Sequence, residues 1–152
     1  MDNANWSLRL GHRLLQLGML LFLFALLVGL VVPKFSVPRL GLSAHLLGIM
    51  QGLFLMVMGV LWPKLKLTRA VSRVAFGLAV YGCFAAWSAN VLAGVWGAGN
   101  SMLPIAAGQA HGSVLQEGII AISLRTAAVS LIAVSLLILW GLRAFTVGTS
   151  DK

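Results

Sequence analysis

Four long apolar stretches, separated by shorter polar or basic connections, dominate the chain. They cover residues 12–32, 42–62, 71–96 and 118–145. Each reaches the roughly 20 residues that an α-helix needs to cross a hydrocarbon layer of about 30 Å. The alternating ten-residue segments of an outer-membrane barrel are absent from the sequence. The pattern therefore predicts one all-α domain over residues 1–152, an integral membrane bundle of four transmembrane helices.

The composition agrees with this fold class. Of the 152 residues, 60% are hydrophobic and only 9% are charged, whereas about a quarter of the residues of a soluble domain are charged. The first stretch is long for the apolar core of a signal peptide, and no small-residue cleavage site follows it. We therefore expect the first stretch to be retained as a helix.

The basic residues are distributed unevenly over the connections. They flank the first stretch and fill the second connection, but the third connection carries none between Trp96 and Glu117. Because cytoplasmic loops are enriched in Lys and Arg, we expect a bacterial-type inner membrane protein with both termini in the cytoplasm. The net charge of +8 then matches anionic lipid headgroups. Since the basic residues belong to separate ends of a bundle, the charge does not indicate nucleic-acid binding.

His45 is the first candidate functional residue, because an imidazole inside an apolar membrane segment needs a partner, a water-filled cavity or a metal. Gly48 and Gly52 follow three and seven residues later and share its helical face. An imidazole beside a flat strip without side chains suits a planar ligand such as a porphyrin. The pattern favours a ligand or catalytic role for His45, with a hydrogen bond to a neighbouring helix as the alternative.

Three further candidates are expected in the same half of the bundle as His45. Gln51 lies about 9 Å further along its helix, and Trp87 and Asn90 belong to the third stretch. Gln51 and Asn90 are the residue types that either bind a polar substrate group or join helices, and both roles stay open. Trp87 is deep enough to line a cavity for an aromatic substrate.

Glu117 and Arg125 belong to the fourth stretch. Glu117 is a candidate catalytic residue, although at an expected helix start its interaction with the helix dipole is the favoured interpretation. Arg125 lies about two turns further in, within about 80° of Glu117 around the helix. The spacing predicts an ion pair, or a shared anionic partner such as a heme propionate. Snorkelling of Arg125 to the membrane surface is the alternative.

The second and third stretches are rich in Gly and Ala, which lets membrane helices approach closely within a bundle or between subunits. Four short helices bury limited surface, so we expect a homo-oligomer. The connection 97–113 is long, rich in Gly and Ala, and uncharged. Since exposed loops are usually more polar, we expect this connection to fold over the end of the bundle.

Several short motifs resemble those of hydroxylaminobenzene mutases. They are Arg13-Leu-Leu-Gln-Leu-Gly18, Pro38-Arg-Leu-Gly-Leu-Ser-Ala-His45, Gln51-Gly-Leu-Phe54, Leu61-Trp-Pro63 and Trp87-Ser-Ala-Asn90. Enzymes of that family convert an arylhydroxylamine into an ortho-aminophenol by moving the hydroxyl group from nitrogen to the ring. The resemblance implies a membrane isomerase that acts on a small aromatic substrate during nitroaromatic degradation.

A more distant likeness is to styrene oxide isomerase, a four-helix membrane enzyme. Ala44-His45 followed by Gln51-Gly52, together with Ala89-Asn90, is similar to motifs of that family. That family is a trimer with heme b held at the subunit interfaces by a histidine of the second helix. Gly94 and Val95 stand where the catalytic tyrosine of that family is expected, which argues against epoxide isomerisation as the main activity.

The resemblance implies that His45 binds ferric heme b, which acts as a Lewis acid on the N–O bond. It also implies a homotrimer. The other candidates divide into a cofactor-binding set (Gly48, Gly52 and Arg125) and a catalytic set (Gln51, Trp87, Asn90 and Glu117).

Two other functions stay open. One is an epoxide isomerase like styrene oxide isomerase, and the other is a non-enzymatic subunit for b-type electron transfer or for transport. Electron transfer through heme b usually requires two axial ligands, and His12 lies at the wrong end of the bundle to pair with His45.

Overall fold

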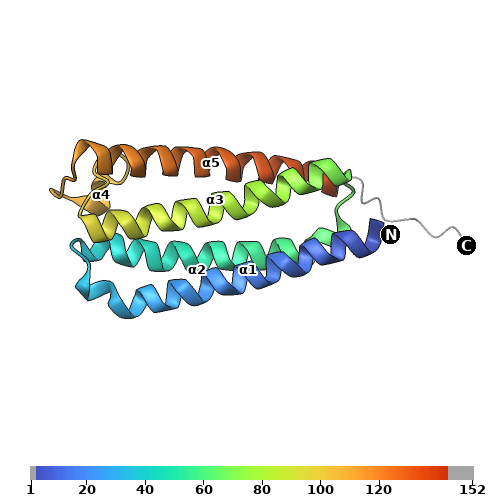
Figure 1. Cartoon of the computed structure of the whole chain (residues 1–152), viewed down its shortest axis with the longest axis horizontal. Helices are drawn as coiled ribbons and strands as arrows, with labels where there is room; N and C mark the ends of the chain where they lie inside the picture. Colours follow the sequence, from blue (N-terminus) through green and yellow to red (C-terminus); the bar gives the residue numbers. More distant parts are fainter. Residues whose placement is uncertain (1–2, 144–152) are drawn as a thin grey trace, which may run out of the picture.

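A computed structural model describes residues 3–143 of the chain (Figure 1). Over these residues the secondary structure is helical throughout, without strands. The long helices are α1 (Asn3–Val31), α2 (Pro38–Leu61), α3 (Arg69–Trp96) and α5 (Val114–Leu142), and the short ones are η1 (Val32–Lys34), η2 (Trp62–Lys64) and α4 (Pro104–Ala107). Each of the four long helices is long and apolar enough to cross a membrane. The all-α, four-helix prediction is confirmed; residues 144–145 of the predicted fourth helix lie outside the described residues.

The long helices begin before the apolar stretches that predicted them. Pro38 occupies the first turn of α2, and Thr68 caps α3 by accepting a hydrogen bond from the Val71 amide at 3.4 Å. Ser113 and Gln116 form a reciprocal capping box at the start of α5. Polar caps satisfy the free amides of a first helical turn, so a helix can start where the apolar pattern has not yet begun.

The helices lie in two neighbouring pairs (Figure 1). α1 packs along α2, α3 packs along α5, and α2 and α3 join the two pairs. One end of the molecule, here called the basic end, contains the start of α1, the connection between α2 and α3, and the end of α5. The opposite end, here called the loop end, contains η1 and the connection 97–113.

Glycines hold α1 and α2 in close contact. A Cβ atom added to Gly18 would lie 2.7 Å from the Gly52 carbonyl oxygen, and one added to Gly52 would lie 2.8 Å from the Gly18 oxygen. Gly11 and Gly59 face each other in the same way, at 2.6 and 2.7 Å. A side chain at any of these positions would push the helices apart. The small residues of α2 therefore serve packing within the bundle, which is one of the two roles predicted for them.

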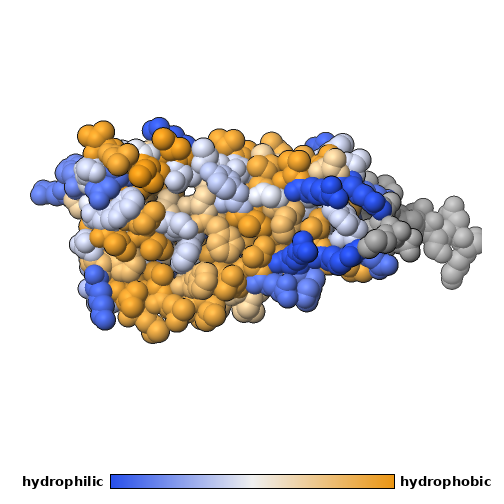
Figure 2. All heavy atoms as spheres, in the orientation of Figure 1, coloured by the Kyte–Doolittle hydropathy of each residue, from blue (hydrophilic) through white to orange (hydrophobic). Residues whose placement is uncertain are grey.

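Large apolar side chains remain exposed along the outside of every long helix, among them Leu27, Met50, Val74 and Leu136. Figure 2 shows the same distribution on one face, where hydrophobic side chains are widespread and the most hydrophilic ones lie towards the two ends. In water such a surface would aggregate, whereas lipid chains solvate it. The exposed surface agrees with helices that cross a membrane.

The connection 97–113 folds onto the loop end, as predicted. Ala98 and Ala107 are buried there with residues of α2, α3 and α5. Glu117 holds the connection together: its Oε1 accepts the amides of Gly99 (2.7 Å), Asn100 (3.3 Å) and Gly112 (3.2 Å). Its Oε2 accepts both the amide and the hydroxyl group of Ser101, at 3.2 and 3.0 Å. One carboxylate thus ties both ends of this connection to the first turn of α5.

Glu117→Gln should loosen this connection. The amide side chain keeps the shape but replaces one accepting oxygen with a donating NH₂ group, which faces backbone donors. We expect local opening to become easier by about 1–3 kcal/mol, so that the amides of Gly99, Ser101 and Gly112 exchange with deuterium about 5- to 150-fold faster. Hydrogen-exchange mass spectrometry measures this directly.

Ser101→Ala is the matched control, because it removes one donor and leaves the carboxylate in place. Its effect on the exchange of the same amides should be clearly smaller. If Glu117→Gln left their exchange unchanged, the carboxylate would not be holding the connection.

Candidate functional site

The imidazole of His45 is anchored to α1. Its Nδ1 atom lies 2.7 Å from the backbone carbonyl oxygen of Ala25, and the residue is half-buried. A carbonyl oxygen can only accept, so Nδ1 carries the proton and donates it. Nε2 then keeps its lone pair and makes no hydrogen bond with the described residues. Histidines that bind metals usually show this arrangement, with one nitrogen bonded to a carbonyl and the other directed to the metal.

Gly29 makes this anchoring possible. A Cβ atom at Gly29 would lie 2.6 Å from Nδ1 and 2.7 Å from Cε1 of His45, so no other residue fits without moving the ring. Sequence reasoning missed Gly29, although a signal exists: Gly11, Gly18 and Gly29 are spaced by seven and eleven residues. Both spacings keep residues on one helical face. In the structure, this is the face of α1 that contacts α2.

Gly48 and Gly52 do not form an open strip beside His45. A Cβ atom at Gly48 would lie 2.6 Å from Cδ1 of Trp87 and 2.7 Å from Cβ of Ala25. At Gly52 it would meet backbone atoms of α1. The flat strip predicted beside His45 is therefore not open within this chain, because the space left by the glycines is filled by α1 and by Trp87. Any fit to a heme group rests on the His45 imidazole and not on this strip.

Trp87 and Gln51 carry buried polar atoms without partners. Trp87 covers Gly48 and stacks on Phe24 of α1, with ring centroids 5.9 Å apart and an interplanar angle of 19°. Its indole Nε1 and the Oε1 of Gln51 are buried and make no hydrogen bond. Gln51 follows Gly48 by three residues, less than one turn of α2. An unsatisfied buried group costs about 1–3 kcal/mol and calls for an explanation such as a bound ligand.

Asn90 has a different environment. It is buried, its Nδ2 donates to the Ala86 carbonyl oxygen at 3.0 Å, and its Oδ1 accepts the hydroxyl group of Ser43 at 3.3 Å. Both polar atoms of the amide are therefore engaged. Ser43 stands two residues before His45 on α2. Of the two roles predicted for Asn90, the structure favours the joining of α2 to α3.

The predicted ion pair between Glu117 and Arg125 does not form. Both oxygens of Glu117 are taken by the connection 97–113, and Arg125 is exposed on α5. The helical spacing allows the pair, but the carboxylate of Glu117 instead accepts hydrogen bonds from backbone amides of the connection 97–113. Arg125 is left without a carboxylate partner among residues 3–143, since Glu117 is the one acidic residue in that range.

At this site the side chains could hold only a metal that brings most of its own ligands. Within the described part of the chain, no three His, Cys, Asp or Glu residues come together in a group that could hold an ion. A single histidine nitrogen suits an iron whose other ligands are mainly porphyrin nitrogens. The donor set at His45 fits heme b in this respect.

Comparisons with known proteins identify the family of the chain. The sequence model described as styrene oxide isomerase matches residues 10–143. Hydroxylaminobenzene mutase HabB of Ectopseudomonas oleovorans is 50% identical over 135 residues, which cover 89% of this chain and 82% of that protein. Hydroxylaminobenzene mutase HabA of the same organism is 37% identical over 125 residues, covering 82% of this chain and 93% of that protein. No solved structure matches.

These matches confirm both resemblances seen in the motifs. They extend over nearly all of the four-helix region, with His45 and the residues around it inside the matched range. The chain is an isomerase and belongs to the styrene oxide isomerase family.

Proposed function

We propose that this protein is a hydroxylaminobenzene mutase, which rearranges arylhydroxylamines such as hydroxylaminobenzene to 2-aminophenols. The reaction breaks the N–O bond, forms a C–O bond at the ortho carbon and returns the displaced ring proton to nitrogen. Substrate and product are isomers, so no oxidant or reductant is consumed. The 50% identity to HabB over most of the chain supports this substrate class. The structural observation that carries the proposal is His45, whose Nδ1 is anchored to Ala25 while Nε2 keeps its lone pair.

We further propose heme b as the cofactor. His45 would hold it through Nε2, and Arg125, which lacks a carboxylate partner, would bind a propionate group. When bound, ferric heme supplies a Lewis acid that polarises the N–O bond and needs no proton from the protein. The scarcity of titratable groups near His45 agrees with such chemistry.

The remaining residues would bind and shield the substrate. The stacked rings of Trp87 and Phe24 provide an apolar wall for the aromatic ring. Gln51 Oε1 accepts a hydrogen bond from the hydroxylamine group, and Trp87 Nε1 donates one. Neither atom has a hydrogen-bond partner in the present structure, and both are buried, so the substrate would have to open the contact between α2 and Trp87 to reach them. The connection tied down by Glu117 covers the loop end and helps to exclude water, which would otherwise attack the activated ring.

The assembly that we propose is a homotrimer in a bacterial-type inner membrane, with the basic end in the cytoplasm. The connection between α2 and α3 carries Lys64 and Lys66, and Arg69 begins α3. The connection 97–113 at the loop end carries no Lys or Arg. This asymmetry supports the orientation through the excess of positive charge in cytoplasmic loops. The exposed apolar face of α5 leaves room for neighbouring subunits.

Product analysis tests the proposed activity. Membranes containing the protein should convert hydroxylaminobenzene to 2-aminophenol, seen by liquid chromatography, while membranes without it should not. His45→Ala should lower the rate at least about 100-fold, the order expected for loss of a central catalytic group. Recovery of unchanged substrate would favour a transport or electron-transfer subunit. Styrene oxide, assayed in parallel, should react poorly.

The visible spectrum tests the cofactor separately. Protein purified from heme-replete cells should show a Soret band, which His45→Ala should reduce or shift. Full mutase activity in protein without that band would overturn the heme assignment and leave the activity in place.

Gly29→Ala should damage the site although Gly29 contacts no substrate. The added Cβ overlaps the imidazole, so the ring must turn and lose its hydrogen bond to Ala25. We expect mutase activity to fall about 10- to 100-fold, in line with the loss of a histidine-orienting contact, while the helical content measured by circular dichroism is retained.

Gly77→Ala is the matched control, because Gly77 is also helical and a Cβ there meets nothing within 4 Å. It should keep full activity. Equal activities in Gly29→Ala, Gly77→Ala and the unmodified protein would show that the bond to Ala25 is not needed.

Gln51→Met should lower the activity without lowering the stability of the protein. It removes an unsatisfied buried oxygen at nearly constant volume, so the melting temperature should stay the same or rise. Loss of one hydrogen bond to the substrate should lower kcat/KM about tenfold. Asn90→Leu, which removes two existing hydrogen bonds, should instead lower the melting temperature. A drop in stability without a change in kcat/KM for Gln51→Met would assign Gln51 to helix packing.

A further inference from the structure

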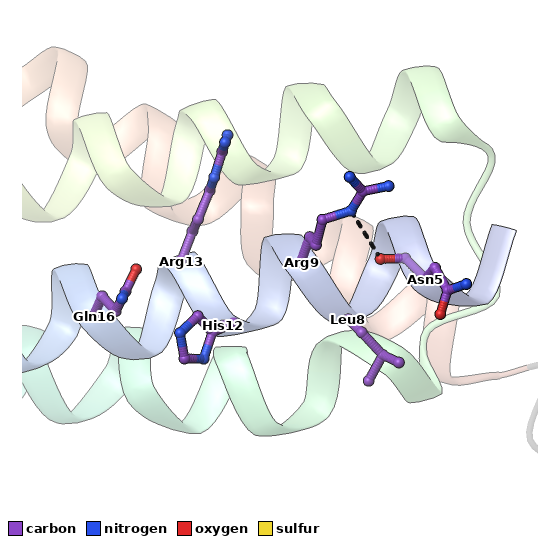
Figure 3. Close-up of a pocket in the computed structure, with 6 residues that line it drawn as sticks. All are labelled: Asn5, Leu8, Arg9, His12, Arg13 and Gln16. Atoms are coloured by element: carbon purple, nitrogen blue, oxygen red, sulfur yellow. Dashed lines mark hydrogen bonds between the residues drawn. The ribbon is translucent and has the colours of Figure 1, made fainter. Parts of the chain in front are cut away.

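The outer face of α1 at the basic end carries an open groove of about 670 Å³. Figure 3 shows its lining, in which Arg9 and Arg13 extend to one side of the helix and Leu8 and His12 to the other. Each pair is four residues apart and so forms a row along the helix. Asn5 and Gln16 complete the lining. All of these residues belong to α1, so the groove is open to the surroundings of the protein.

The groove is strongly cationic, and no acidic residue among positions 3–143 lies near it. Glu117 is the one acidic residue between positions 3 and 143, and it is bound at the opposite, loop end. The Nε of Arg9 donates to the Asn5 carbonyl oxygen at 3.2 Å, which restrains the guanidinium group beside the groove (Figure 3). Arg13 is exposed. An anion from outside the described chain would therefore find two guanidinium groups without carboxylate partners.

A second hollow of about 250 Å³ adjoins the first and shares both arginines with it. Its lining is Trp6, Arg9, Leu10 and Arg13. Arg73 of α3 reaches the same place, with its Cζ 5.7 Å from the Trp6 ring. A third cation thus stands beside the Arg9–Arg13 row, and a tryptophan marks the depth at which aromatic side chains collect in membranes.

The depth of the groove agrees with the headgroup region of a bilayer. The apolar span of α1 runs from Asn5 to Lys34, so Arg9 and Arg13 lie about 6 and 12 Å from its start. A bilayer has about 40–45 Å of total thickness around a hydrocarbon core of about 30 Å. The two arginines therefore lie near the boundary between headgroups and hydrocarbon, where lipid phosphates are within reach of their side chains.

The same face of α1 becomes apolar beyond Gln16. The exposed residues that continue it are Met19, Leu23, Leu27 and Leu30. Spacings of three and four residues keep them on the side of α1 that the groove occupies. A cationic groove followed by an apolar stripe matches the division of a phospholipid into a charged headgroup and an acyl chain.

We propose that this groove is a binding site for an anionic phospholipid. Arg9 and Arg13 bind the phosphate through paired N–H donors, because a planar guanidinium group can donate two parallel hydrogen bonds to one phosphate. His12 and Gln16 offer further polar contacts, and an acyl chain lies along the apolar stripe. The stripe favours a lipid over free phosphate, since free phosphate would make no use of it.

Native mass spectrometry of the delipidated, detergent-purified protein tests this site. The protein should bind phosphatidylglycerol in preference to phosphatidylcholine with the same acyl chains. The double variant Arg9→Gln/Arg13→Gln should lower the affinity for phosphatidylglycerol about 30-fold, the effect of two basic residues near an anionic surface. Lys34→Gln/Arg39→Gln removes the same charge from exposed positions at the loop end and should keep the affinity.

Each other outcome overturns the proposal. Unchanged affinity in the double variant would show that the groove is not the site. Displacement of the lipid by excess inorganic phosphate would show a site for free phosphate. A change in subunit number with unchanged lipid affinity would assign the arginines to contacts between copies of the chain. Should the double variant fail to fold, Arg9→Lys/Arg13→Lys keeps the charge but removes the paired donors, and it should weaken phosphatidylglycerol binding several-fold; unchanged affinity would overturn the paired contact.

Discussion

The close approach of α1 to α2 is the contact on which the candidate site depends. In a membrane, lipid chains compete equally for apolar side chains, so helices associate through close packing of small residues. Gly18 and Gly52 leave no room for a Cβ atom between the two backbones. Further along the same contact, Gly29 lets the His45 ring reach the Ala25 carbonyl oxygen. The orientation of the imidazole is therefore a consequence of helix packing.

Hydrogen bonding separates the structural polar residues from the candidate functional ones. Asn90 and Glu117 use both of their polar side-chain atoms within the fold, so substrate binding would have to break existing bonds. Gln51 and Trp87 each keep a buried atom without a partner, and His45 keeps one nitrogen. Buried polar atoms are normally satisfied in native proteins. The Nε1 atom of Trp62, just beyond the basic end of α2, is also buried without a partner. An unpaired atom therefore indicates a ligand site only together with its position, as for Trp87, which covers Gly48 within one turn of His45.

The sequence predicted the number and type of helices well, because the thickness of a membrane sets the length of an apolar span. It placed the start of α1 too late, at 12 instead of Asn3, since polar residues also form helix. The sequence identified His45 as a candidate because an imidazole inside a membrane span needs a partner, a water-filled cavity or a metal. Gly29 was missed, and the filling of the strip beside Gly48 was not foreseen, because the sequence of one helix does not reveal which residues of another helix face it. The register between helices is a property of the tertiary structure.

Charge divides the molecule along its long axis. His45 lies about 10 Å from the start of α2 at the loop end and about 24 Å from its end at the basic end. Arg9 and Arg13 belong to the basic end, so they are too far from the N–O bond of a substrate at His45 to stabilise charge there directly. Their conservative explanation is contact with the membrane surface, where anionic headgroups supply a counter-charge that residues 3–143 do not provide at this end. At the loop end, the carboxylate of Glu117 is fully hydrogen-bonded to the connection 97–113, so it serves the fold and does not act on a group bound at His45.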